Sequence, residues 1–357
     1  MRHVELECIS KRFGSTIAVD NVSLSVNLGE IFSLLGPSGC GKTTTLRIIA
    51  GLVKPDSGRV YIGGNDVTDI PTEKRNVGMV FQNYALWPHM TVYDNIAFGL
   101  KLRRLPQEEI RRRVKEVLAL VKLEGFENRY PTQLSGGQQQ RVSLARALAL
   151  NPEVILLDEP LSNLDAKLRE ELRYELRTLL KSLKITSVYV THDQLEALTI
   201  SDRIAVMNHG RIVQIGTPRE VYEEPTNRFV AAFIGESTII EGKLIDVEDN
   251  YGVVKLKGGI KIRGRIPRGV SLTRNSDVML IIRPEAIHVS EETPGENILV
   301  CKPVREIYIG ERIEYRLDCE GYELKLKLPS NKPLSMGSEI SVSLDSQRTI
   351  IVGKKEE

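Results

Sequence analysis

Two kinds of hydrophobic spacing divide the chain. Up to about residue 235, short apolar runs alternate with stretches of helical spacing, and beyond Gly235 apolar and polar residues alternate one by one. Apolar runs are typical of strands buried on both faces of a parallel sheet, whereas strict alternation is typical of half-buried antiparallel strands. The pattern predicts an α/β domain over residues 1–235 and a smaller all-β domain over residues 236–357.

Strands and helices take turns in the predicted α/β domain. Ile31–Leu35 and the run 154–157 are continuous apolar stretches, and the apolar segment 188–190 follows later. The order strand, helix, strand predicts βαβ units with parallel strands. The intervening helix carries one apolar stripe, made of Leu168, Leu172, Leu176, Leu179, Leu180 and Leu183.

A helical insert is predicted between these strands, over about residues 83–150. Its clearest part is an amphipathic stretch with apolar residues at helical spacing, namely Ile110, Val114, Val117, Leu118 and Val121. The basic residues 111–113 on its polar face suit either a solvated surface or a membrane surface. Helical spacing returns over residues 219–233.

The last third of the chain alternates with a period of two. The apolar members of three such stretches are Ile313, Tyr315 and Leu317, then Tyr322, Leu324, Leu326 and Leu328, and finally Ile340, Val342 and Leu344. Short half-buried strands separated by Gly, Asn and Pro predict a small β-barrel of the oligosaccharide/oligonucleotide-binding (OB) type.

Composition narrows the possible environments. The chain has 357 residues, is 41% hydrophobic and carries a net charge of +2, which gives no electrostatic case for nucleic-acid binding. No apolar run approaches the roughly 18 residues that a membrane span needs, and the charged N-terminus does not resemble a signal peptide. Neither CxxC spacing nor a disulfide framework is expected among Cys8, Cys40, Cys301 and Cys319, which indicates a reducing, cytosolic compartment.

A glycine-rich segment follows the first buried strand and opens a helix through Leu46, Ile48 and Ile49. In this setting its backbone N–H groups are expected to cradle phosphates, with Lys42 on the β- and γ-phosphates and the Thr43 hydroxyl on Mg²⁺. Cys40 is expected to be a small residue at a variable loop position, and a redox role is the less favoured alternative. The predicted nucleotide contacts here are Gly36, Pro37, Ser38, Gly39, Cys40, Gly41, Lys42, Thr43 and Thr44.

A carboxylate pair follows the second apolar run. Asp158 and Glu159 emerge at the carboxyl end of a predicted parallel strand, the edge where α/β proteins gather their ligands. We expect Asp158 to hold the Mg²⁺ shell and Glu159 to orient or deprotonate the attacking water.

Four segments together resemble the ABC ATPase family: Gly-Pro-Ser-Gly-Cys-Gly-Lys-Thr at 36–43, Leu-Ser-Gly-Gly-Gln at 134–138, Leu-Leu-Asp-Glu-Pro at 156–160 and Val-Thr-His-Asp at 190–193. Residues 78–82, 84–89 and 161–165 are similar to the ATPase subunits of maltose-type importers, within the sugar, polyamine and ferric-ion group. The resemblance covers residues 1 to about 235 and implies the P-loop NTPase ABC cassette fold with a helical subdomain.

The resemblance implies roles for further residues. Gln82 matches the glutamine that contacts Mg²⁺ and water, His192 the switch histidine at the γ-phosphate, and Asp165 a carboxylate at the dimer interface. Phe13 matches the aromatic residue that stacks on adenine, although as a residue of a predicted N-terminal strand it also suits the core. The signature segment that reaches the γ-phosphate held by the other subunit is Ser135, Gly136, Gly137 and Gln138.

Partners are also implied by the resemblance. ATP would bind in composite sites of a homodimer, or of a dimer with a close paralogue, that drives transmembrane permease subunits at the cytoplasmic face of the membrane and serves a solute-binding protein indirectly. The helical insert and Trp87 suit the permease contact, although Trp87 equally suits core packing. The β domain, with Arg-Pro-Glu at 283–285, would regulate and support the dimer or merely stabilise the chain.

The sequence leaves two questions open. A soluble ABC protein of DNA repair, chromosome organisation or translation is the rival function, but the chain shows one cassette and neither a long coiled-coil insertion nor zinc-ligand spacing. For an importer, the resemblance favours carbohydrate as the solute, with polyamine, ferric ion or an inorganic anion as alternatives.

Overall fold

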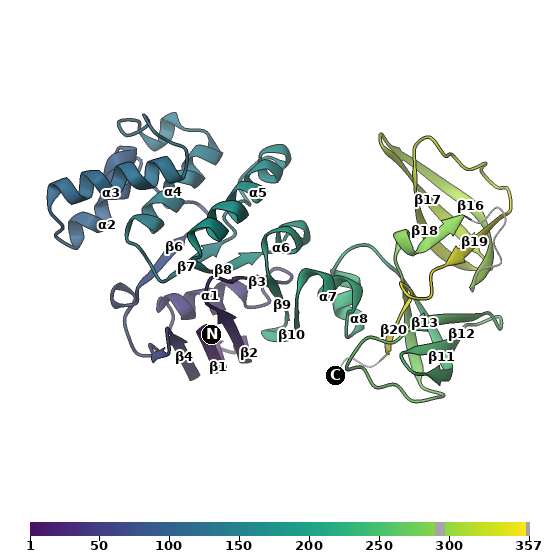
Figure 1. Ribbon diagram of the computed structural model, residues 1–357. Helices are drawn as coiled ribbons and strands as arrows, with labels where there is room; N and C mark the ends of the chain where they lie inside the picture. Colours follow the sequence, from purple (N-terminus) through teal and green to yellow (C-terminus); the bar gives the residue numbers. More distant parts are fainter. Residues whose placement is uncertain (290–296, 355–357) are drawn as a thin grey trace. The chain divides into compact units, whose positions relative to one another are not determined.

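The computed structural model describes residues 1–289 and 297–354, and the chain forms two compact units, Met1–Pro218 and Arg219–Glu357 (Figure 1). Each unit has its own sheets and its own hydrophobic core. The units divide before Gly235, where the sequence changes its spacing. Within the described ranges, no helix combines the length and the hydropathy that crossing a bilayer requires.

A six-stranded sheet forms the centre of the first unit, in the order β10-β9-β3-β8-β7-β6. Strands β9 to β6 are parallel and β10 is antiparallel. Every residue of β3, β7 and β8 is buried, which confirms the strands predicted from apolar runs. The bounds are β3 Ile31–Leu35, β6 Val77–Val80, β7 Val154–Asp158, β8 Thr186–Thr191, β9 Arg203–Asn208 and β10 Arg211–Gly216.

A second, antiparallel sheet in this unit has the order β2-β1-β4-β5. One core cluster joins β1, the central sheet and helix α1, because apolar residues of all three pack together. Helix α1 is therefore packed into the core that these two sheets share. The bounds are β1 Arg2–Phe13, β2 Thr16–Asn27, α1 Lys42–Ala50, β4 Ser57–Ile62 and β5 Asn65–Asp66.

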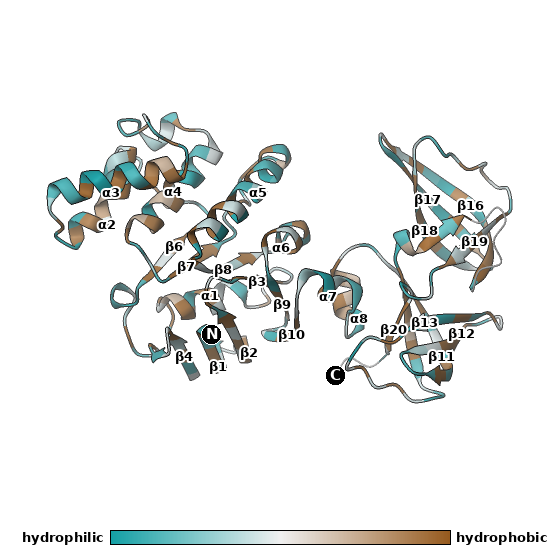
Figure 2. Cartoon of the chain, in the orientation of Figure 1, coloured by the Kyte–Doolittle hydropathy of each residue, from teal (hydrophilic) through white to brown (hydrophobic). Residues whose placement is uncertain are grey.

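The predicted helical insert is present between β6 and β7. Its helices are α2 Val92–Leu102, α3 Gln107–Leu120 and α4 Gly136–Ala149, accompanied by the 3-10 turns η1 Thr72–Lys74 before β6 and η2 Pro131–Gln133 before α4. The apolar side of α3 is buried, and Figure 2 shows hydrophilic residues along its remaining surface. Arg111 and Arg112 there are more than 60% exposed and pair with Glu108 and Glu116, as a solvated face would.

Helix α5, Ala166–Leu183, connects β7 to β8, and the short α6, Gln194–Ile200, follows β8. Leu172, Leu176 and Leu180 of the predicted stripe are buried in the same core cluster as the insert, and the other leucines of the stripe are partly buried against it. The predicted βαβ unit is confirmed.

Two short helices, α7 Pro218–Glu223 at the division between the units and α8 Arg228–Phe233 after it, replace the single helical stretch expected over 219–233. The barrel of the second unit is closed by five strands in the order β11-β12-β13-β20-β14. Their bounds are β11 Thr238–Glu248, β12 Tyr251–Lys255, β13 Lys261–Arg265, β14 Asp277–Ile282 and β20 Ile350–Gly353.

A separate five-stranded sheet follows the order β15-β19-β16-β17-β18. The all-β prediction is confirmed, but the alternating strands on which it rested, β17 to β19, lie in this sheet and not in the barrel. The bounds are η3 Pro284–Ala286, β15 Ile287–Val289, β16 Ile298–Ile309, β17 Arg312–Cys319, β18 Tyr322–Pro329 and β19 Ile340–Leu344.

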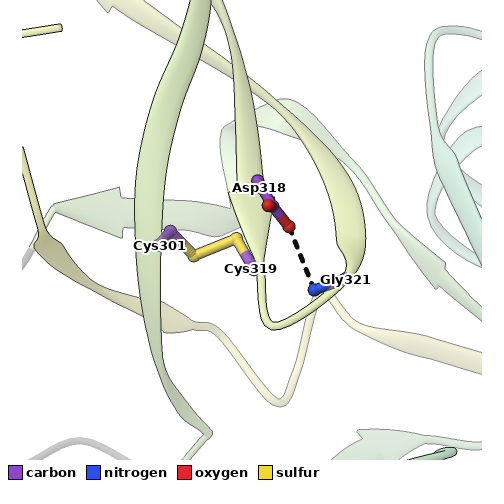
Figure 3. Close-up of a disulfide and its surroundings, with 4 residues drawn as sticks. All are labelled: Cys301, Asp318, Cys319 and Gly321. Carbon is purple, nitrogen blue, oxygen red and sulfur yellow. Dashed lines mark hydrogen bonds between the residues drawn. A yellow bond between two sulfur atoms is a disulfide. The ribbon is translucent and has the colours of Figure 1, made fainter. Parts of the chain in front are cut away.

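The expectation that the cysteines form no disulfide is wrong for one pair. Cys301 and Cys319 are bonded, with their Cα atoms 4.1 Å apart (Figure 3). Lys302 pairs with Asp318 between β16 and β17, and this register places the two neighbouring cysteines opposite each other. Their separation of 18 residues in the chain did not reveal the pairing. The cysteines therefore give no support to a reducing compartment. Cys8 and Cys40 are free thiols.

Candidate functional site

The loop between β3 and α1 requires glycine at two positions. A Cβ atom on Gly36 would lie 2.3 Å from the Met207 carbonyl oxygen, and one on Gly41 would lie 2.3 Å from the Ala18 carbonyl oxygen. Gly41 also has a φ of 103° and caps α1. The backbone of the predicted phosphate loop is therefore fixed by close approach to neighbouring strands, and its N–H groups precede a helix N-terminus as an anion site needs.

Lys42 is buried and curls back over this loop. Its Nζ donates to the Gly36 and Pro37 carbonyl oxygens at 2.8 and 2.9 Å and lies 3.9 Å from the Cys40 Sγ. Burial raises the pKa of the Cys40 thiol, and the charge of Lys42 opposes that rise. A buried thiol kept in its neutral form is a poor nucleophile, which favours the interpretation of Cys40 as a small loop residue.

Thr43 and Asp158 face each other across the loop and the end of β7. The Thr43 hydroxyl donates to Asp158 Oδ1 at 3.1 Å, and Asp158 is 5% exposed. Burial raises the pKa of Asp158, while the bond from Thr43 and the charge of Arg47 oppose the rise. A hydroxyl and a carboxylate side by side form an oxygen donor set that fits Mg²⁺, an ion that takes few protein ligands beside phosphate and water.

Glu159 lies where three segments meet. Its backbone has a φ of 46°, and its N–H donates to the Val190 carbonyl of β8 at 3.0 Å. Its Oε2 accepts from the Gln82 amide at 3.3 Å and lies 3.1 Å from His192 Nδ1. The Glu159 side chain is 17% exposed and that of His192 is 54% exposed, so water can reach both side chains.

Comparison with known proteins agrees with this geometry. Residues 19–162 match the family model described as ABC transporter, and residues 280–352 match the TOBE domain. The chain is 47% identical over 356 residues to the spermidine/putrescine import ATP-binding protein PotA of Rubrobacter xylanophilus, covering 99% of this chain and 94% of that protein. It is an ATP-binding subunit of the ABC transporter family.

Two further comparisons extend this result. This ABC subunit is 46% identical over 329 residues to the Fe(3+) ions import ATP-binding protein FbpC of Escherichia coli, covering 92% of this chain and 91% of that protein. The dimeric, post-hydrolysis structure of the ATP-binding cassette MJ0796 bound to ADP and Pi is 38% identical, covering 60% of this chain and 99% of that chain, with a TM-score of 0.54. The predicted membership of the sugar, polyamine and ferric-ion importer group is confirmed, and so is the prediction of an ATPase.

The signature segment of the ABC subunit forms the start of α4. Ser135 caps the helix: its Oγ accepts from the Gln138 N–H at 3.4 Å, and the Gln138 side chain accepts from the Ser135 N–H at 2.9 Å. Gly136 and Gly137 begin the helix. The polar side chains of the segment are therefore used in capping their own helix, and their predicted role at a second subunit stays a prediction.

Two other predicted contacts lie at element ends. Asp165 caps α5 by accepting from the Leu168 N–H at 3.0 Å. Phe13 ends β1 and is 52% exposed, so the alternative that it is a core residue is wrong. The ring of Phe13 is open to a ligand on the surface, next to the Lys11 ammonium at 5.6 Å.

Trp87 is half-buried. Its ring packs 4.4 Å from that of Phe98 in α2, and the Arg146 guanidinium of α4 lies 5.0 Å from it. Arg146 also donates to the Tyr84 and Ala85 carbonyl oxygens, which fixes the segment after Gln82 against the helical insert. Packing of Trp87 within the insert is thus observed.

The sequence missed two side chains that hold these segments together. The Asn163 amide donates to the Gln82 carbonyl at 2.8 Å, and Arg169 donates to backbone carbonyls of the segment that follows Glu159. Both residues bond to main-chain oxygens, so no residue type at a fixed spacing could have indicated them. Their location next to predicted site residues was the only available signal.

Proposed function

We propose that this ABC subunit hydrolyses ATP at the edge of the central sheet and so drives the permease subunits of an importer. The observation that carries the proposal is the placement of Glu159 between Gln82 and His192, next to the Thr43–Asp158 pair. A water held by the three side chains would lie beside a γ-phosphate bound by the glycine-rich loop.

The residues divide into binding and hydrolytic groups. Lys42 would leave the carbonyl oxygens of its own loop for the β- and γ-phosphates, and the backbone N–H groups from Ser38 to Thr44 would complete the cradle. Thr43, Asp158 and Gln82 would hold Mg²⁺, which when bound neutralises phosphate charge. Glu159 would orient or deprotonate the attacking water, and His192 would fix it and contact the γ-phosphate.

The working unit we propose is a dimer, of two copies or of this chain with a close paralogue. Ser135, the following glycines and Gln138 would reach the nucleotide of the partner, and Asp165 would line the interface. The dimeric structure of the similar cassette MJ0796 supports this. We place the dimer on the cytoplasmic face of a membrane, where residues near Gln82 and Trp87 would meet the permease.

We further propose a polyamine as the imported solute. The relatives named for spermidine and putrescine include one that matches 99% of this chain, and relatives named for ferric ion match at 46% identity. These names favour the alternatives to carbohydrate, and the carbohydrate preference of the sequence gains no support from them. The nucleotide site itself does not touch the solute.

Glu159→Gln tests the hydrolytic role, since glutamine keeps the size and the hydrogen bonds but cannot take a proton. We expect ATP turnover to fall by about 100-fold or more while ATP still binds and holds the protein as a dimer in size-exclusion chromatography. Glu170→Gln, an exposed carboxylate on α5, is the control and should leave turnover unchanged. Unchanged turnover in Glu159→Gln would refute the assignment.

Calorimetric titration of the solute-binding protein encoded beside this chain tests the solute. We expect spermidine or putrescine to bind it, and ferric complexes and maltose not to bind. Tight binding of a ferric complex would move the assignment to iron, and binding of a sugar would restore the carbohydrate preference.

A further inference from the structure

The proposed hydrolytic side chains come from three segments: the one around Gln82, the segment Glu159–Asp165 and the turn of His192. The segment Glu159–Asp165 is linked to both of the others. At its start, the Ser162 hydroxyl donates to the Glu159 carbonyl at 2.9 Å. In its middle, the Asn163 side chain donates to the Gln82 carbonyl at 2.8 Å. Any shift of this segment would therefore move the backbone of both Glu159 and Gln82.

Arg169, in the first turn of α5, holds the same segment from the other side. Its Nη2 donates to the Leu164 carbonyl at 2.9 Å and to the Ser162 carbonyl at 3.3 Å. Its Nη1 lies 3.7 Å from the carboxylate of Asp193, the residue after His192. Asp193 in turn caps α6 by accepting from the Leu195 and Glu196 N–H groups, so it is a firm anchor.

The charge of Arg169 also acts on Tyr84, which follows Gln82 by two residues. Burial raises the pKa of the Tyr84 phenol, and the charge of Arg169 opposes that rise. The side chain is 28% exposed, so its charge acts from a largely dry position. One planar group with fixed donors thus links the turn of His192 to the segment of Asp165.

We propose that Arg169 is a positioning residue for hydrolysis, which sets the distance between the His192 turn and the Glu159–Asp165 segment. It does not touch the nucleotide loop in the described part of the chain. The proposal rests on the proposed ATPase mechanism. Because the reacting groups must be placed to within about 1 Å, loosening of this link should slow the chemical step and leave ATP binding intact.

Arg177, two turns further along α5, supplies a matched control. Its side chain is 34% exposed, it donates to the Ile200 and Ser201 carbonyls, and it lies 3.5 Å from the Asp202 carboxylate. Like Arg169 it joins α5 to two carbonyls and one carboxylate, but none of these belongs to a segment with a predicted hydrolytic residue. Replacing Arg177 therefore shows whether an effect at Arg169 comes from misplaced hydrolytic groups or from the loss of an arginine that stabilises the fold.

The test compares Arg169→Ala, Arg169→Lys and Arg177→Ala in full-length protein by steady-state ATP hydrolysis and thermal unfolding. We expect Arg169→Ala to lower kcat by about tenfold or more with the KM for ATP within about twofold of the wild type. Arg177→Ala should lower the Tm by a similar amount without changing kcat. Arg169→Lys, which keeps the charge near Asp193 but not the fork of donors, should give an intermediate kcat.

Equal kcat values for Arg169→Ala and Arg177→Ala would overturn the proposal, and so would a loss in Arg169→Ala that a raised KM accounts for. A wild-type protein that does not hydrolyse ATP would instead refute the proposed function. The two failures are therefore distinguishable within one experiment.

Discussion

The two units of the chain place their important residues in opposite ways. In the α/β unit, Asp158 ends β7, and Glu159 and His192 come one position after β7 and β8, so their order in the sequence gives their place at one sheet edge. In the β unit, β20 closes the barrel beside β13 and β14, and the Cys301–Cys319 bond depends on the register of two strands. Short motifs can reveal the first arrangement, whereas the second depends on long-range pairing.

The largest predicted effect concerns the motifs of the α/β unit. We predict that the motifs of one chain do not form a complete ATP site and that a second chain completes it. We expect Lys42→Ala and Ser135→Arg each to reduce hydrolysis by about 100-fold, the first by loss of a phosphate contact and the second by blocking the partner's site. Mixing the two variants should restore activity, since each mixed dimer has one site without a substitution.

Phosphate release by the mixture, compared with each variant alone at the same total concentration, is the measurement. If both variants dimerise and no activity returns, the sites are not shared between chains.

A second prediction concerns the β unit. Reduction of the Cys301–Cys319 bond should lower the free energy of unfolding of this unit by about 3 kcal/mol, because an 18-residue loop is released in the unfolded chain. Hydrolysis should be unaffected, since the predicted site residues belong to the other unit. Thermal unfolding with and without a phosphine reductant, together with ATPase assays, measures both effects.

The double variant Cys301→Ala/Cys319→Ala serves as the control and should not respond to the reductant. A reductant effect that persists in it would contradict the assignment of the stability change to this bond.

The smallest predicted effect is the dependence of the protein's stability on pH that comes from Glu196. Glu196 is 2% exposed, and its Oε2 accepts from the Tyr189 and Thr191 hydroxyls at 2.8 and 2.7 Å. Burial raises the pKa of Glu196, although these two bonds oppose the rise. The folded protein therefore holds this proton more tightly than the unfolded chain, and the associated stability is lost as pH rises through the raised pKa.

Glutamine at this position keeps an acceptor and does not titrate. The stability of Glu196→Gln relative to the wild type should improve as the pH rises from the ordinary pKa of a glutamate, about 4.3, through the raised pKa of Glu196. Urea unfolding at each pH measures the difference. A difference that does not change with pH would contradict the raised pKa.

How far the sequence predicts the molecule follows from the range of each interaction. The strand Ile31–Leu35 and the start of α1 are determined by neighbouring residues, and the structure has both. Arg169 and Asn163 bond to carbonyl oxygens, which every residue carries, so nothing in the pattern distinguishes them. Phe13 alternates like a core residue, but it lies at the end of β1, where the side chain reaches solvent. The Cys301–Cys319 bond could not be predicted, because it depends on the register of two strands and the sequence pattern does not give that register.

The left-handed backbone at Glu159 has a practical consequence for engineering. A φ of 46° costs a residue with a long side chain about 1 kcal/mol or more, whereas asparagine adopts it readily. Glu159→Asn should therefore survive heating better than the natural chain and hydrolyse no ATP. Directed evolution that rewards thermal tolerance alone would discard this carboxylate early, so a useful library of this protein has to be screened for turnover in the same round.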